Sequence, residues 1–139
     1  MLTVSLRPVK LNERANSEPS MELEGETRSA SETGQIVPYY QPLVDLKTGV
    51  VVGCEVLARW QDPKRGLLLP REFMPIVRDA GELGSLTYGL LNRAITDARD
   101  WSGSLSIALN LPPQMLNENC VAEKLLEILT KEGFPPQRL

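Results

Sequence analysis

A chain of 139 residues with 42% hydrophobic and 24% charged residues has the length and composition of one globular domain. Its formal net charge of -3 excludes the basic field that recognition of a long nucleic acid needs. Histidine is absent, so acid–base or metal chemistry must fall to Asp, Glu, Asn, Lys or water, and oxygen ligands would favour Mg²⁺ or Mn²⁺.

The features that bear on location are few. Cys54 and Cys120 are far apart and lack metal-ligand spacing, so we interpret them as unpaired thiols in a reducing compartment. The apolar start Met1–Val4, followed by basic residues, is too short and in the wrong order for a secretory signal. No apolar run approaches the roughly 18 residues that a membrane helix needs. We therefore expect a cytoplasmic protein without membrane contact.

The first part of the chain differs in composition from the rest. Residues 1–35 contain no aromatic side chain and are rich in serine and glutamate. Such a segment buries too little surface to offset the entropy lost on ordering. We expect a flexible, acidic and Ser-rich tail or linker over residues 1–35 and a folded unit over residues 36–139.

The folded unit is expected to open with a β-hairpin. Residues that favour strands fill 36–44, and the polar turn Asp45–Gly49 separates them from a second apolar run that begins at Val50. This second strand should end near Trp60, before a loop over residues 61–66 that contains Pro and Gly.

Helices are expected in three places. Pro70 suits the first position of a helix, which Pro75 should limit to a short or distorted one. From Leu83 to Asp100, apolar residues recur three and four apart and predict an amphipathic helix. A last helix is expected over residues 121–132, where Gly133 closes it.

A short buried strand is expected over residues 105–110, between the last two helices. Its alternation places Leu105, Ile107 and Leu109 on one face and Ser106, Ala108 and Asn110 on the other. The order strand, strand, helix, helix, strand, helix predicts a largely parallel sheet covered by helices. Residues 135–139 look like the lead-in to a further strand, so we expect the sheet to be unfinished.

The second strand carries the residues best suited to chemistry. Alternation places Glu55 and Arg59 on one face with Gly53 and Leu57, with roughly 13 Å between the backbones of Glu55 and Arg59. A carboxylate can hold a divalent metal while a guanidinium grips a phosphate oxygen. Asn110 adds an amide at the carboxyl end of a strand, where parallel sheets bind ligands. The same side chains could equally lie on a solvated face, and Asn110 could simply end its strand.

Several segments of the chain resemble one protein family. Residues 40–49 (YQPLVDLKTG) and 53–60 (GCEVLARW) resemble the opening of the EAL domain of bacterial cyclic di-GMP phosphodiesterases. The stretches 69–75, 80–84 and 107–111 follow in the family's order, so the likeness covers residues 38–139.

The resemblance implies an α/β fold that forms part of a TIM-like (β/α) barrel of EAL type, with an antiparallel first strand. It implies hydrolysis of cyclic di-GMP to pGpG with Mg²⁺ or Mn²⁺. By motif, Glu55 and Asn110 would be metal ligands, and Arg59 would contact a phosphate of the ligand. Gln41 would line the nucleotide pocket, and Leu57 would be a packing residue of the same ligand-binding strand.

The chain also departs from the family pattern. Val56 replaces the Ala of the motif, a variant found in both hydrolysing and merely binding members. Val77-Arg78 stands where the family usually has Ala-Glu, and Pro112 where it usually has Ser. Family members continue well past the length of this chain, with a third metal-binding Glu, an Asp-Asp pair and a Lys near the attacking water.

We therefore expect the N-terminal portion of an EAL phosphodiesterase domain, which retains the first part of the cyclic di-GMP site but does not hydrolyse the nucleotide at a useful rate on its own. Two alternatives stay open: a binding or interaction module without turnover, and the remnant of a disrupted gene. Open strand edges and uncovered apolar faces predict a homo-oligomer, aggregation, or pairing with a partner protein that completes the barrel.

Overall fold

The computed structural model describes residue 30, residues 33–117 and residues 120–139, so most of the expected tail lies outside the described residues. No helix in these ranges is long and apolar enough to cross a membrane. The elements are, in chain order, β1 Ile36–Val44, β2 Val51–Asp62, β3 Gly66–Leu68, α2 Pro70–Asp79, α3 Leu83–Ala98, β4 Ser106–Leu109, the 3-10 helix η1 Pro113–Asn117, α4 Val121–Lys131 and the 3-10 helix η2 Pro136–Arg138.

The folded part reaches slightly further towards the N-terminus than Ile36. Ala30 is 1% exposed and belongs to the same core cluster as Trp60. The backbone carbonyl of Gln35 accepts a hydrogen bond from the Gln61 N–H, and its side-chain oxygen accepts one from the Trp60 indole over 3.1 Å. The residues immediately before β1 are thus fastened to β2.

A long hairpin organises the sheet, as the sequence predicted. β1 and β2 pair antiparallel, with a register shift beside Val44. The Asp45 carboxylate accepts hydrogen bonds from the backbone N–H groups of Lys47 and Thr48 and so closes the turn. Gly49 has a φ of 70°, a conformation that glycine adopts without steric cost.

The element order predicted a largely parallel sheet, and this prediction is wrong for the described residues. The sheet has four strands, of which β1 and β3 run antiparallel to β2 and β4 runs parallel to it. The turns that join β1 to β2 and β2 to β3 are too short for the crossover that a parallel pair needs. The antiparallel first strand is confirmed.

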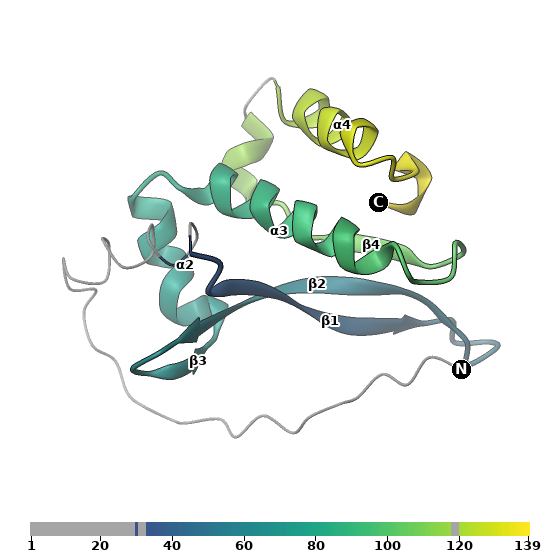
Figure 1. Cartoon of the computed structure of the whole chain (residues 1–139), viewed down its shortest axis with the longest axis horizontal. Helices are drawn as coiled ribbons and strands as arrows, with labels where there is room; N and C mark the ends of the chain where they lie inside the picture. Colours follow the sequence, from purple (N-terminus) through teal and green to yellow (C-terminus); the bar gives the residue numbers. More distant parts are fainter. Residues whose placement is uncertain (1–29, 31–32, 118–119) are drawn as a thin grey trace.

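Helices α3 and α4 lie over one face of the sheet, and α2 lies near the β3 end of the hairpin (Figure 1). The core between α3 and the sheet is apolar and closely packed, and four α3 residues in it are fully buried. They meet Val56 of β2 and Ile107 of β4, and they are Leu91, Ala94, Ile95 and Ala98. The ring of Phe73 from α2 packs edge-on against Trp60 at 6.0 Å.

Two details differ from expectation in the helical segments. Helix α2 continues through Pro75 to Asp79, because a proline there removes a single helical hydrogen bond, the one to the Arg71 carbonyl. Residues 136–138 form the 3-10 helix η2 instead of an extended lead-in to a strand. Arg138 fastens η2 to the start of β4 by donating from Nε to the Leu105 carbonyl over 2.8 Å.

Candidate functional site

The sheet face opposite α3 and α4 carries the polar side chains selected from the sequence. Residues paired across strands share a face, and Glu55 lies opposite Gln41 of β1 and opposite Ala108 of β4. Cys54 and Val56 of β2 are buried on the other side of the strand. Among the described residues, no helix covers the Glu55 side (Figure 1).

Glu55 and Asn110 meet on this face. Asn110 follows Leu109, the last residue of β4, and its Nδ2 donates a hydrogen bond to Glu55 Oε1 over 2.6 Å. The close approach of β4 depends on Gly53, because a Cβ there would lie 2.4 Å from Ser106 Oγ and 2.7 Å from the Ser106 carbonyl oxygen. The two residues predicted as metal ligands are thus neighbours in space.

Arg59 lies four residues further along the same face of β2, but the structure does not bring it into contact with Glu55 or Asn110. Its Nη1 donates to the carbonyl of Ala58 over 2.7 Å. Its Cζ lies 5.8 Å from the centre of the Tyr39 ring, within the range of a cation–π contact. The guanidinium therefore rests along the strand.

The other two residues selected from the sequence also lie on the Glu55 face. Gln41 is exposed, directly opposite Glu55 on β1. Leu57 is partly buried and pairs with Tyr39. The strand alternation thus brings Gln41, Glu55 and Leu57 to one surface that solvent reaches.

The Glu55–Asn110 pair fits part of a metal site. The hydrogen bond uses Glu55 Oε1 and Asn110 Nδ2, so the oxygen atoms outside this bond are Glu55 Oε2 and Asn110 Oδ1. Such oxygens are ligands that Mg²⁺ and Mn²⁺ favour. Within residue 30 and residues 33–117 and 120–139, no group of three or more His, Cys, Asp or Glu could hold a metal. The described residues supply two oxygen donors, fewer than a complete site needs.

A groove of about 460 Å³ runs from Asn110 between α2 and the segment after β4. Its walls include Arg71, Arg78 and Gln114. None of these three residues was selected from the sequence as a site residue. Arg71 and Arg78 lie seven residues apart on α2, a spacing that puts both on one face of the helix.

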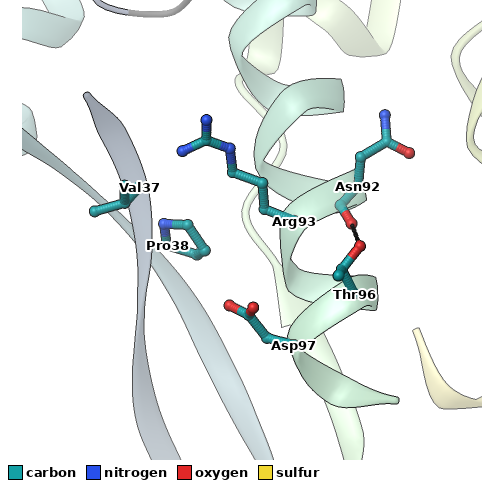
Figure 2. A pocket seen from close by; sticks show the side chains of 6 residues that line it. All are labelled: Val37, Pro38, Asn92, Arg93, Thr96 and Asp97. Atoms are coloured by element: carbon teal, nitrogen blue, oxygen red, sulfur yellow. Dashed lines mark hydrogen bonds between the residues drawn. The ribbon is translucent and has the colours of Figure 1, made fainter. Parts of the chain in front are cut away.

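A second cavity of about 380 Å³ lies between β1 and α3 (Figure 2). Arg93 Nη1 donates to the carbonyls of Gly34 and Ile36 over 3.0 Å each, and Asp97 accepts a hydrogen bond from the Tyr40 hydroxyl. Burial, and then the hydrogen bond to Asp97, raises the pKa of Tyr40. We assign these charged groups to holding β1 against α3.

Comparison with known proteins identifies relatives of the chain. The family model described as "EAL domain" matches residues 24–139. The chain is 31% identical to the probable cyclic di-GMP phosphodiesterase PdeI of Escherichia coli, over 81% of this chain and 15% of that protein. It is 31% identical to the cyclic di-GMP phosphodiesterase RocR of Pseudomonas aeruginosa, over 76% of this chain and 28% of that protein.

A solved structure titled as the PaMucR phosphodiesterase in complex with c-di-GMP matches with a TM-score of 0.80 and 28% identity, over 86% of this chain and 50% of that one. The FimX EAL domain from Pseudomonas aeruginosa matches in fold with a TM-score of 0.75 at 21% identity, over 85% of this chain and 48% of that one. The chain thus spans about half of these solved chains and under a third of PdeI and RocR. The expected fold class, part of a TIM-like barrel of EAL type, is confirmed.

Proposed function

Because this chain belongs to the EAL domain family, we propose that the Glu55 face of its sheet is the first part of a cyclic di-GMP site. The observation that carries this proposal is the 2.6 Å contact between Glu55 and Asn110, which joins an oxygen-bearing side chain of β2 to one directly after β4. The names of the relatives support it, since PdeI and RocR are named as cyclic di-GMP phosphodiesterases.

Each side chain would have a distinct role. Glu55 and Asn110 would hold Mg²⁺ or Mn²⁺ through side-chain oxygens, and the ion would supply polarisation of a phosphate oxygen and a more acidic bound water. Arg59 would donate paired N–H groups to a phosphate of the nucleotide, once its guanidinium leaves the Ala58 carbonyl. Gln41 would line the nucleotide pocket beside Glu55, and Leu57 would pack beneath the ligand.

We further propose that the polypeptide of 139 residues retains the first part of a phosphodiesterase site but does not hydrolyse cyclic di-GMP at a useful rate by itself. Metal-assisted hydrolysis of a phosphodiester needs several oxygen ligands to balance the charge of the ions. Glu55 and Asn110 provide a single carboxylate and a single amide at their point of contact. A binding module without turnover is therefore the second candidate function, and the same contact favours it.

The proposal extends to location and partners. Cys54 and Cys120 are both free thiols, which supports a reducing compartment and hence the cytoplasm. The open sheet face carries Tyr39 and Leu43, each 36% exposed. We propose that a second copy or a partner protein covers this face, because apolar surface beside open strand edges favours association.

The decisive experiment is a calorimetric titration of the purified chain with cyclic di-GMP in Mn²⁺ buffer and in EDTA, with pGpG measured by chromatography. We expect saturable binding that Mn²⁺ strengthens, and no pGpG above the rate in buffer. Formation of pGpG that Glu55→Ala abolishes would contradict the lack of turnover. Absence of binding in both buffers would contradict the nucleotide assignment.

A further inference from the structure

Tyr39 of β1 is an aromatic neighbour of Arg59 on the Glu55 face. Strand pairing sets Tyr39 opposite Leu57 and sets Val37 opposite Arg59, so the tyrosine lies diagonally across from the arginine. Diagonal neighbours on paired strands are within reach of aromatic and long side chains. The two side chains do meet, because Arg59 Cζ lies 5.8 Å from the centre of the Tyr39 ring.

The position of the ring sets the direction in which the guanidinium is attracted. Glu55 and Arg59 lie roughly 13 Å apart along β2, whereas Leu57, the residue opposite the ring, lies roughly 7 Å from Glu55. A phosphate bound to an ion at Glu55 would lie within this span. Tyr39 therefore attracts the guanidinium towards the end of the strand where the proposed site places the phosphate.

The contact with the ring is compatible with phosphate binding. Arginine carries five N–H donors, and the Ala58 carbonyl accepts one hydrogen bond from Nη1 over 2.7 Å. The attraction between the charge and the ring is electrostatic, so it can persist while the N–H groups turn towards a ligand. Arg59 is partly buried and Tyr39 is 36% exposed, so water screens the contact only in part.

We propose that Tyr39 is a positioning residue for Arg59; the inference rests on the proposed function. Its ring holds the guanidinium near the level of Leu57, so the long side chain loses less conformational freedom when it grips the phosphate. Tyr39 acts through Arg59 and not through a contact with the nucleotide. The ring carries this role and the hydroxyl does not, because a cation–π attraction comes from the charge distribution of the ring.

The test is a double-mutant cycle on affinity for cyclic di-GMP, measured by calorimetric titration in EDTA. Tyr39→Leu removes the ring, and Tyr39→Phe is the matched control that keeps it. We expect Tyr39→Leu to weaken binding by about 2- to 5-fold and Tyr39→Phe to bind as wild type does. In the Arg59→Ala background, Tyr39→Leu should cause no further loss, because the group through which it acts is gone.

The cycle separates this role from the alternatives. An equal loss for Tyr39→Leu in both backgrounds would show a direct contact with the nucleotide or a damaged fold, and would overturn the inference. Wild-type affinity in Tyr39→Leu would overturn it too, as would a loss in Tyr39→Phe as large as that in Tyr39→Leu. In each of these cases, weaker binding by Arg59→Ala alone would leave the proposed function standing. A wild type that does not bind the nucleotide would overturn both proposals.

Discussion

Asn110 donates a 2.6 Å hydrogen bond to Glu55 although 55 positions separate the two residues in the chain. The parallel register of β2 and β4 sets Glu55 beside Ala108, two residues before Asn110. The backbone ladder thus fixes the spacing of the two side chains. Because Glu55 lies on β2 and Asn110 directly follows β4, the pairing of these two strands holds the two side chains close together.

The first prediction concerns the carboxylate. Glu55→Gln keeps the shape of the side chain and removes its charge, so the part of cyclic di-GMP affinity that depends on Mn²⁺ should fall by about 10- to 100-fold. Calorimetric titration with and without Mn²⁺ measures this part directly. Glu123→Gln, an exposed glutamate of α4, is the control and should respond to Mn²⁺ as wild type does. A full Mn²⁺ response in Glu55→Gln would remove Glu55 as a ligand.

The second prediction concerns the guanidinium. Hydrogen bonds to charged groups contribute about 1.5–3 kcal/mol each, so Arg59→Ala should weaken cyclic di-GMP binding by at least tenfold. Arg59→Lys keeps the charge but not the forked donors, so its affinity for cyclic di-GMP should lie between those of wild type and Arg59→Ala. Both variants are titrated in EDTA, where metal contributes nothing. Wild-type affinity in Arg59→Ala would show that the guanidinium stays on the Ala58 carbonyl.

The third prediction concerns the packing of β4 against β2. In Gly53→Ala the new Cβ would meet Ser106 at 2.4 Å, so β4 must move and carry Asn110 away from Glu55. We expect a loss of about 1–3 kcal/mol in the free energy of unfolding, together with a weaker response to Mn²⁺. Gly103→Ala is the control, because a Cβ there meets nothing within 4 Å. Chemical denaturation of both variants provides the comparison, and equal stability would contradict the role of Gly53.

The sequence predicted the elements that carry a strong periodic signal. β1 has the expected bounds, and α3 begins at Leu83 as the apolar spacing indicated. The three-residue strand β3 was missed, because a run such as Leu67-Leu68-Leu69 is too short to show alternation and Pro70 follows it directly. Helix α2 continued through Pro75 because its packing through Phe73 and Val77 compensates for one lost hydrogen bond.

The site was predicted less fully than the fold. Alternation in β2 placed Glu55 and Arg59 on one face, but no local pattern shows that Arg59 rests on Tyr39 and Ala58. The contact of Glu55 with Asn110 follows from the pairing of β2 with β4, which links distant parts of the chain. The Arg71 and Arg78 wall of the groove was missed because it needs the placement of α2 beside the segment after β4.

The fourth prediction concerns pH. Asp62 is 7% exposed, and burial raises its pKa, but hydrogen bonds from the Arg65 side chain and from the backbone of Arg65 and Lys64 outweigh burial and bring the pKa below its usual value. A lowered pKa stabilises the fold at pH values above the unfolded pKa of about 3.9, and this contribution is lost as pH falls through the folded value.

Asp62→Asn should therefore be less stable than wild type by about 1–3 kcal/mol at pH 7. The difference in stability between wild type and Asp62→Asn, here called the gap, should narrow below about pH 4, where wild type loses the contribution of its carboxylate. Thermal melts between neutral and acidic pH measure the gap. Asp100→Asn, at an exposed position, is the control and should follow wild type. A gap that stays constant down to acidic pH would contradict a charge-based role for Asp62.

The last prediction concerns self-association through the uncovered sheet face. Leu43 lies on this face near the hairpin turn, where Val44, Leu46 and Val50 are also exposed, Leu46 by 98%. If a second copy covers the face, the mass measured by light scattering should rise with protein concentration. Leu43→Lys should raise the dissociation constant about tenfold or more, because burying one leucine contributes about 1.5–3 kcal/mol. Leu126→Lys, on α4 and 53% exposed, tests whether any exposed leucine has the same effect. Equal weakening by both variants, or a monomer at every concentration, would exclude the sheet face as the contact between copies.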